Sequence, residues 1–127
     1  EADIVLKNCS ELLNTNGKLL ITVPDLDIYI TRFKNKTLKS IPNLEEWSHN
    51  RISKNSQLSD YFSIYTHSMI HEKHLWCYNK NGLVGKIKST GMFKNVRKIG
   101  ILNKLAGIPF SHNRPEEDLC VLASKSD

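Results

Sequence analysis

The sequence predicts an α/β domain with about three strands and flanking helices. An apolar run at residues 18–23 ends abruptly at Pro24-Asp25, two shorter apolar runs follow near the C-terminus, and helical apolar spacing separates them. The length of 127 residues fits a single domain that covers residues 1–127. Its 39% hydrophobic residues place the chain well above the disordered class.

The first predicted elements are a helix over residues 1–13 and a strand over 18–23. The helix is amphipathic and carries one apolar stripe at Ile4, Val5, Cys9, Leu12 and Leu13. Residues 14–17 end it, because Asn and Gly can take the left-handed conformation that closes a helix. The strand lacks polar alternation, so both of its faces should be covered. A short helix from Leu26 to Phe33 follows.

The middle of the chain predicts an insertion. Residues 34–57 are polar, rich in lysine and interrupted by Ile41-Pro42, which favours a lid or surface excursion with a short helix at 44–48. An aromatic-rich segment over residues 60–69 predicts a helix packed over the core.

The last third of the chain predicts a helix and two strands. Asn79 or Asn81 can cap a helix that runs through Ser89 and stops at Gly91. Its inward side is expected at Leu83, Val84 and Ile87. Strands are predicted at 96–99 and 119–123. Residues 102–110 lie between them and are broken by glycine and proline, which predicts a loop or short helix.

Four segments in this order carry a resemblance to a known family. They are LLNTNGKLLI at 12–21, VPD at 23–25, HLWCY at 74–78 and GMFKNV at 91–96. Together they resemble the C-terminal half of a Rossmann-like S-adenosylmethionine-dependent methyltransferase of the type 11-like group. The resemblance implies that the strand at 119–123 lies between those at 18–23 and 96–99 and runs antiparallel to them.

The resemblance also implies that something is missing from these 127 residues. In that family a fourth strand covers the free edge of the strand at 18–23, so a missing N-terminal half or a second subunit is the expected partner there. The family binds S-adenosylmethionine at a glycine-rich turn, whereas the glycines here form no G-x-G. We therefore expect no cofactor-binding residues in this chain, and an isolated chain that is inactive.

The resemblance implies that these residues form the substrate-binding side of a methyltransferase. Its acceptor would be a small molecule or a carbohydrate-like compound. Pro24 and Asp25 follow the first strand, where open α/β sheets bind ligands. Asp25 is a candidate catalytic residue that would orient a substrate hydroxyl or amine; the alternative is that it caps the next helix. His74 is a candidate general base or a structural hydrogen-bonding residue. Trp76 and Tyr78, with Pro24, are candidate substrate contacts.

A zinc site is a rival hypothesis. His67, His71 and His74 fall on one helical face if the helix continues that far, and Cys77 follows one turn later. The spacing is not a known zinc-protease motif, because residues 71–74 are one residue short of H-E-x-x-H. We therefore assign no metal ligands in this sequence.

A polyanion-binding or nucleic-acid-binding module is the second rival, and a non-catalytic remnant of the fold is the third. The net charge is +5, and the basic stretch at residues 73–114 contains no Asp or Glu. The stretch either forms a basic face for an anionic partner or consists of solvated helix and loop positions. Its basic residues are not interleaved with aromatic residues that could stack on bases, and it matches no nucleic-acid-binding motif, so nucleic acid is the less favoured partner.

Cysteine usage and hydropathy predict a cytoplasmic protein. Cys9, Cys77 and Cys120 are an odd number of widely spaced thiols with no C-x-x-C, as in reduced proteins. No apolar stretch approaches the ~18 residues that a membrane-spanning helix needs.

Overall fold

The computed structural model describes residues 1–35, 77–112 and 115–126, which belong to two compact units. The first unit combines Glu1–Asp25 with Tyr78–Asp127, and the second is Leu26–Cys77. Helix α2 (Leu26–Lys34) belongs to the second unit and confirms the short helix predicted after Pro24-Asp25. The remainder of the predicted insertion at 34–57, with the helices expected at 44–48 and 60–69, lies outside the described residues.

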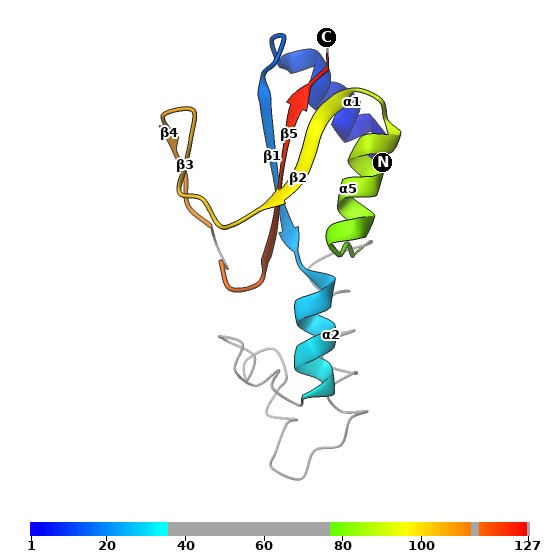
Figure 1. Ribbon diagram of the computed structural model, residues 1–127, viewed down its shortest axis with the longest axis vertical. Helices are drawn as coiled ribbons and strands as arrows, with labels where there is room; N and C mark the ends of the chain where they lie inside the picture. The colour runs from blue at the N-terminus through cyan, green and yellow to red at the C-terminus, as the bar shows by residue number, and fades with distance from the viewer. Residues whose placement is uncertain (36–76, 113–114, 127) are drawn as a thin grey trace. The chain divides into compact units, whose positions relative to one another are not determined.

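A three-stranded sheet forms the centre of the first unit. Its strands are β1 (Lys18–Pro24), β2 (Phe93–Ile99) and β5 (Asp118–Lys125), in the order β1-β5-β2 (Figure 1). Strand β5 runs antiparallel to both neighbours, so β1 and β2 point in the same direction. This confirms the predicted strand order and the reversed final strand. The carboxyl ends of β1 and β2 therefore lie at the same end of the sheet.

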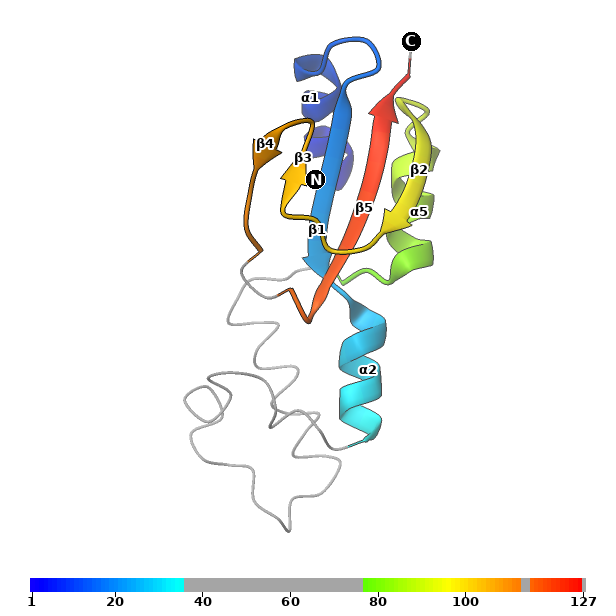
Figure 2. The same ribbon diagram turned by 60° about the vertical axis from the view of Figure 1, so that its left-hand side comes forward.

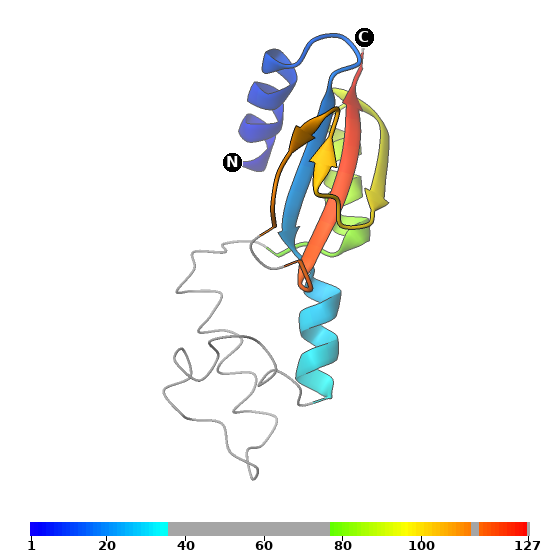
Figure 3. The same ribbon diagram turned by 90° about the vertical axis from the view of Figure 1, so that its left-hand side faces the viewer.

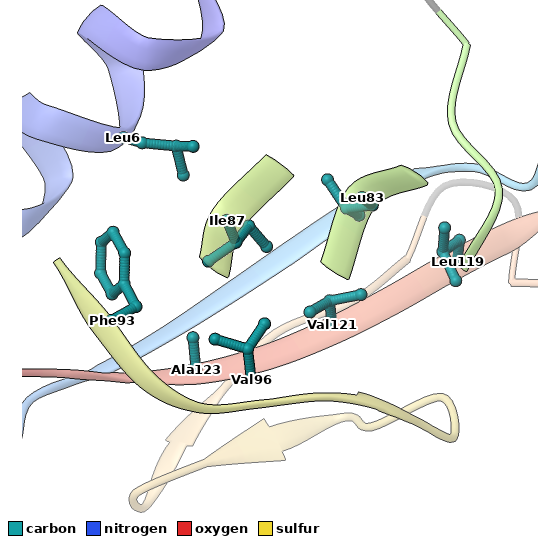
Figure 4. Close-up of a cluster of buried hydrophobic side chains, with 8 residues drawn as sticks. All are labelled: Leu6, Leu83, Ile87, Phe93, Val96, Leu119, Val121 and Ala123. Carbon is teal, nitrogen blue, oxygen red and sulfur yellow. The ribbon is translucent and has the colours of Figure 1, made fainter. Parts of the chain in front are cut away.

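Two helices cover one face of this sheet. Helix α1 (Ala2–Leu12) and helix α5 (Lys80–Ser89) both lie behind the strands in Figure 2, and a small hairpin lies on the opposite face (Figures 2 and 3). Side chains alternate along β5, so every second residue faces the helices. These residues meet apolar side chains of α1, α5 and β2, and Figure 4 shows the resulting core of Leu6, Leu83, Ile87, Phe93, Val96, Leu119, Val121 and Ala123.

The ends of α5 follow from local sequence. The Asn79 side chain accepts a hydrogen bond of 3.0 Å from the Gly82 N–H, which settles the predicted choice between Asn79 and Asn81. Gly91 follows the helix with φ +69°, a left-handed conformation that glycine adopts without strain. The chain then enters β2 three residues earlier than predicted. A register irregularity between Lys94 and Arg97 surrounds Asn95, whose φ is 57°.

The prediction of a loop or short helix at residues 102–110 was wrong. The segment forms a hairpin of β3 (Lys104–Leu105) and β4 (Ile108–Pro109). Ala106 and Gly107 join the strands, and their φ values of 50° and 86° are those of a type I′ turn. Pro109 is tolerated because a two-stranded hairpin has only edge strands. In this segment glycine marks the tight turn of a hairpin, and proline lies on an edge strand. The sequence analysis interpreted both residues as interruptions of regular structure.

The base of the hairpin is tied to β5 by His112. Its Nδ1 lies 2.8 Å from an Asp118 carboxylate oxygen, and its Nε2 lies 2.7 Å from the Leu102 carbonyl oxygen. Each ring nitrogen thus contacts an oxygen that can accept a hydrogen bond, and which nitrogen donates depends on the tautomer. His112 therefore fixes both ends of the hairpin segment to the sheet.

Only part of the apolar stripe of α1 packs on the sheet. Leu6 and Ser10 are the buried residues of this helix, and Cys9 and Leu13 pack at the margin of the core. The remaining members of the stripe, Ile4, Val5 and Leu12, are 63%, 59% and 86% exposed. The apolar arc is wider than the sheet surface available to it, because no described strand extends the sheet beyond β1.

Strand β1 is also less covered than predicted. Lys18 and Thr22 are exposed and the strand's other residues are partly buried, whereas most of β5 is buried. The reason is position: β5 has a strand on each side, and β1 pairs with β5 alone among the described strands. In the part of the chain that the structure describes, no helix is long and apolar enough to cross a membrane.

Candidate functional site

The sequence-predicted residue Asp25 stands at the carboxyl end of β1 and is buried. Its backbone N–H donates a 2.8 Å hydrogen bond to the Glu117 carbonyl oxygen, which continues the β1–β5 ladder by one step. Asp25 also forms an isolated parallel bridge with Tyr78. Backbone contacts on both sides thus hold this aspartate, which is only 3% exposed, in a fixed position.

Lys98 supplies a countercharge to this aspartate. The Lys98 Nζ lies 3.3 Å from an Asp25 carboxylate oxygen, and the side chains are 42% and 4% exposed, respectively. A buried carboxylate is costly unless it is paired, so the lysine compensates part of the desolvation. The lysine comes from β2, and the two residues meet because β1 and β2 are parallel with β5 between them.

A second buried acidic residue, Glu117, lies next to Asp25 in the sheet. Glu117 is 1% exposed and precedes β5, opposite Asp25 in the backbone ladder. The sequence reading missed both Glu117 and Lys98. The sequence does contain a signal for Lys98. This residue lies two positions after the core residue Val96, so strand alternation places both on the same face of the sheet. A charged side chain on the face that forms the core needs a partner of opposite charge.

The structure brings only some of the predicted site residues together. Asp25, Pro24 and Tyr78 lie in the first unit, and Tyr78 is partly buried against the core. His74 and Trp76 lie outside the described residues, as do His67 and His71 of the zinc hypothesis. Cys77 is partly buried and belongs to the second unit. The described residues contain no group of three or more potential metal ligands.

The Asp25–Lys98 pair offers two kinds of contact to a ligand. A carboxylate accepts hydrogen bonds from a hydroxyl or amine, and an ammonium donates to a carbonyl, carboxylate or phosphate oxygen. The more exposed partner is the lysine, so a ligand in solution meets the ammonium first and the carboxylate behind it. The pair is thus suited to a polar ligand that carries a donor and an acceptor close together.

The opposite face of the sheet holds a buried thiol. Cys120 is 1% exposed, and burial raises its pKa above the ordinary value of 9.0, opposed by a contact of 3.8 Å with the Thr22 hydroxyl. Asp118 raises this pKa further and Lys98 lowers it. The protonated, buried form is a poor nucleophile, so we assign Cys120 no catalytic role.

This thiol predicts a loss of stability at high pH. Well below pH 9.0 the thiol is protonated in both the folded and the unfolded chain and adds no pH dependence. Above that pH the unfolded chain releases the proton first, so the free energy of unfolding falls as the pH rises towards the folded-state pKa. Urea denaturation from pH 8 to pH 10.5 measures the slope. The Cys120→Ala variant should show a shallower decline, and an identical decline in both proteins would contradict this assignment.

Comparison of the chain with protein-family models, curated proteins and solved structures found no match.

Proposed function

We propose that this chain is the substrate-side portion of an S-adenosylmethionine-dependent methyltransferase with a Rossmann-like fold. Its acceptor would be a small molecule or a carbohydrate-like compound with a hydroxyl or amine group. The observation that carries the proposal is the buried Asp25 carboxylate, 3.3 Å from Lys98 at the carboxyl ends of two parallel strands. In open α/β sheets this is the end at which ligands bind.

The chemistry of methyl transfer gives the pair a role. The acceptor must be aligned with the methyl group, and its proton must leave as the new bond forms. Asp25 would accept a hydrogen bond from the acceptor hydroxyl or amine, and Lys98 would hold the carboxylate in place. The strand order β1-β5-β2 with a reversed final strand supports the proposed fold. The cofactor glycine loop would come from outside these residues, which hold no G-x-G.

Nuclear magnetic resonance titration tests this proposal. Backbone amide shifts are recorded while a panel of amino alcohols, phenols and monosaccharides is added to the 127-residue chain. We expect at least one class to shift residues around Asp25, Tyr78 and Lys98, and the Asp25→Asn variant to lose these shifts because the amide removes the negative charge and the ion pair. Calorimetric titration with S-adenosylhomocysteine should show no binding to the isolated chain.

A matched variant sharpens the result. Asp3→Asn also breaks an ion pair, that of 2.7 Å with Lys86, but away from the site, and should leave the titration unchanged. Shifts that gather elsewhere, or persist in Asp25→Asn, would contradict the proposed site.

The structure gives little support to the alternative that this chain binds a polyanion through its basic stretch. Lys86 and Lys98 from the acid-free stretch are engaged in ion pairs with Asp3 and Asp25. The other basic residues of this stretch are distributed over α5, β2 and the hairpin, as Lys80, Lys88, Lys94, Arg97 and Lys104. Adding a heparin fragment in the same titration tests the polyanion hypothesis. We expect the backbone amide signals of these basic residues not to shift.

A further inference from the structure

The His112 side chain joins the hairpin segment to strand β5 through two short contacts. Its Nδ1 lies 2.8 Å from an Asp118 carboxylate oxygen, and its Nε2 lies 2.7 Å from the Leu102 carbonyl oxygen. The His112 and Asp118 side chains are 5% and 13% exposed, so water competes little for these contacts. The Phe110 ring packs edge-on against the imidazole, with the ring centroids 5.5 Å apart. We call the His112–Asp118 pair, with its contact to Leu102, the hairpin tether.

The hairpin tether requires one more proton than its two side chains hold when they are apart above neutral pH. A backbone carbonyl oxygen can only accept, so the contact of 2.7 Å with Leu102 needs a proton on Nε2. The contact of 2.8 Å then needs a second proton between Nδ1 and the Asp118 oxygen, carried by the ring or by the carboxyl group. A neutral histidine and an ionised aspartate hold only one proton between them. The tethered pair therefore binds one proton more, whichever of its groups carries it.

The charged groups around the hairpin tether leave Asp118 as its electrostatic partner. The β1 residue opposite Asp118 is a proline, which carries no charge. The Cys120 thiol of β5 interacts electrostatically with Asp118 and with Lys98 of β2, and burial raises its pKa above 9.0, so this thiol is uncharged near neutral pH. Lys104 of the hairpin and Glu116 are exposed to solvent, where water and salt screen their charges.

We propose that the hairpin tether is a pH-sensitive switch, which holds the hairpin to β5 at pH values below neutral and releases it as the pH rises. When the pair gives up its second proton to water, one of the two contacts joins lone pairs that repel each other. An untethered histidine titrates at about pH 6.5, and below that pH both forms are protonated and the tether keeps its full strength. Above it, each pH unit weakens the tethered form by up to about tenfold, because that form alone retains the proton.

The switch acts on the connection between β2 and β5, which carries the hairpin over the sheet face opposite the helices (Figures 2 and 3). An isolated two-stranded hairpin is marginally stable in water, so release from β5 should also loosen the pairing of β3 with β4. This inference does not rest on the proposed function, because neither His112 nor Asp118 belongs to the Asp25–Lys98 pair. Hairpin release and ligand binding at Asp25 can therefore fail independently.

Backbone amide hydrogen exchange of the 127-residue chain between pH 6 and pH 8 is the test. The Phe110 N–H reports on the hairpin, because it donates a hydrogen bond of 3.0 Å to the Asn103 carbonyl oxygen. After correction for the intrinsic pH dependence of exchange, its protection should fall about tenfold over this range. The Val121 amide in β5, between β1 and β2, should keep its protection, since Cys120 remains protonated at these pH values.

Asp118→Asn is the decisive variant. An asparagine amide can donate to an unprotonated Nδ1, so a neutral His112 protonated on Nε2 satisfies both contacts without the extra proton. The Phe110 amide should then be protected equally at pH 6 and at pH 8. His112→Phe keeps an aromatic ring beside Phe110 but removes both hydrogen bonds, so the Phe110 amide should be weakly protected at both pH values.

The matched control is Asp3→Asn. It also neutralises a carboxylate of an ion pair, that with Lys86 on the helix side of the sheet, and should show the same fall in Phe110 protection as the wild type. Equal protection of the wild-type Phe110 amide at pH 6 and pH 8 would overturn the proposal. An Asp118→Asn protein that still loses protection tenfold would do the same, as would nitrogen-15 spectra that show His112 Nε2 without a proton at pH 6.

Discussion

Replacing Ile87 with alanine should lower the free energy of unfolding by about 2–5 kcal/mol. Ile87 is fully buried in α5 and contributes to the core formed by α1, α5 and the sheet. Removing its side-chain carbons loses their transfer free energy and leaves a cavity that the packed strands fill only in part. Urea denaturation followed by circular dichroism measures the change as a lower midpoint at an unchanged slope.

The control for this variant is Ile108→Ala. Ile108 is 69% exposed, so the same chemical change should alter the free energy of unfolding by less than about 0.5 kcal/mol. Equal losses at the two positions would show that α5 does not pack on the sheet as described. The comparison also tests the placement of the hairpin residue on the surface.

Gly17→Ala should also destabilise the protein, by about 1–3 kcal/mol. A Cβ atom at this position would lie 2.7 Å from the Asn14 carbonyl oxygen and 3.1 Å from two carbon atoms of the Leu13 side chain. The backbone cannot move aside easily. The Gly17 N–H donates to Asn14 at 2.7 Å, and its carbonyl accepts from Lys125 at 2.9 Å. Either the turn or the first rung of the β1–β5 ladder must give way.

Gly85→Ala is the matched substitution with the opposite expected sign. A Cβ atom on Gly85 meets nothing within 4 Å, and the residue lies inside α5. Alanine should therefore raise the free energy of unfolding by about 0.5–1 kcal/mol through its greater helix propensity. Thermal unfolding of the two variants beside the wild type would separate them. Destabilisation by Gly85→Ala would contradict the open position that the structure gives it.

Local patterns in the sequence were sufficient for most elements of the first unit. The helix at 80–89 has its apolar residues at helical spacing, a capping asparagine before it and a glycine after it, and these signals act within a few residues of each other. The runs that became β1 and β5 are rich in apolar residues and bounded by polar turns. The strand order was predicted through the family resemblance, since local pattern alone does not fix which strands are neighbours.

The candidate site was predictable only in part. Asp25 follows from its position after an apolar run, because strand ends are where α/β sheets hold ligands. Its partner Lys98 is 73 residues away in sequence, and their contact exists because β5 brings β1 and β2 to the same end of the sheet. Glu117 is buried by the same arrangement. Contacts between segments this far apart depend on topology, which residue spacing does not encode.

The sequence by itself determined where this chain forms helices α1 and α5 and strands β1 and β5, since propensity, capping and hydrophobic period act over short distances. Only the tertiary structure decided which apolar residues became core. Leu12 and Leu83 look alike in the sequence, yet they are 86% and 4% exposed. The physical reason is that burial requires an opposing surface. The sheet supplies one beneath α5, whereas beyond β1 no described strand extends it.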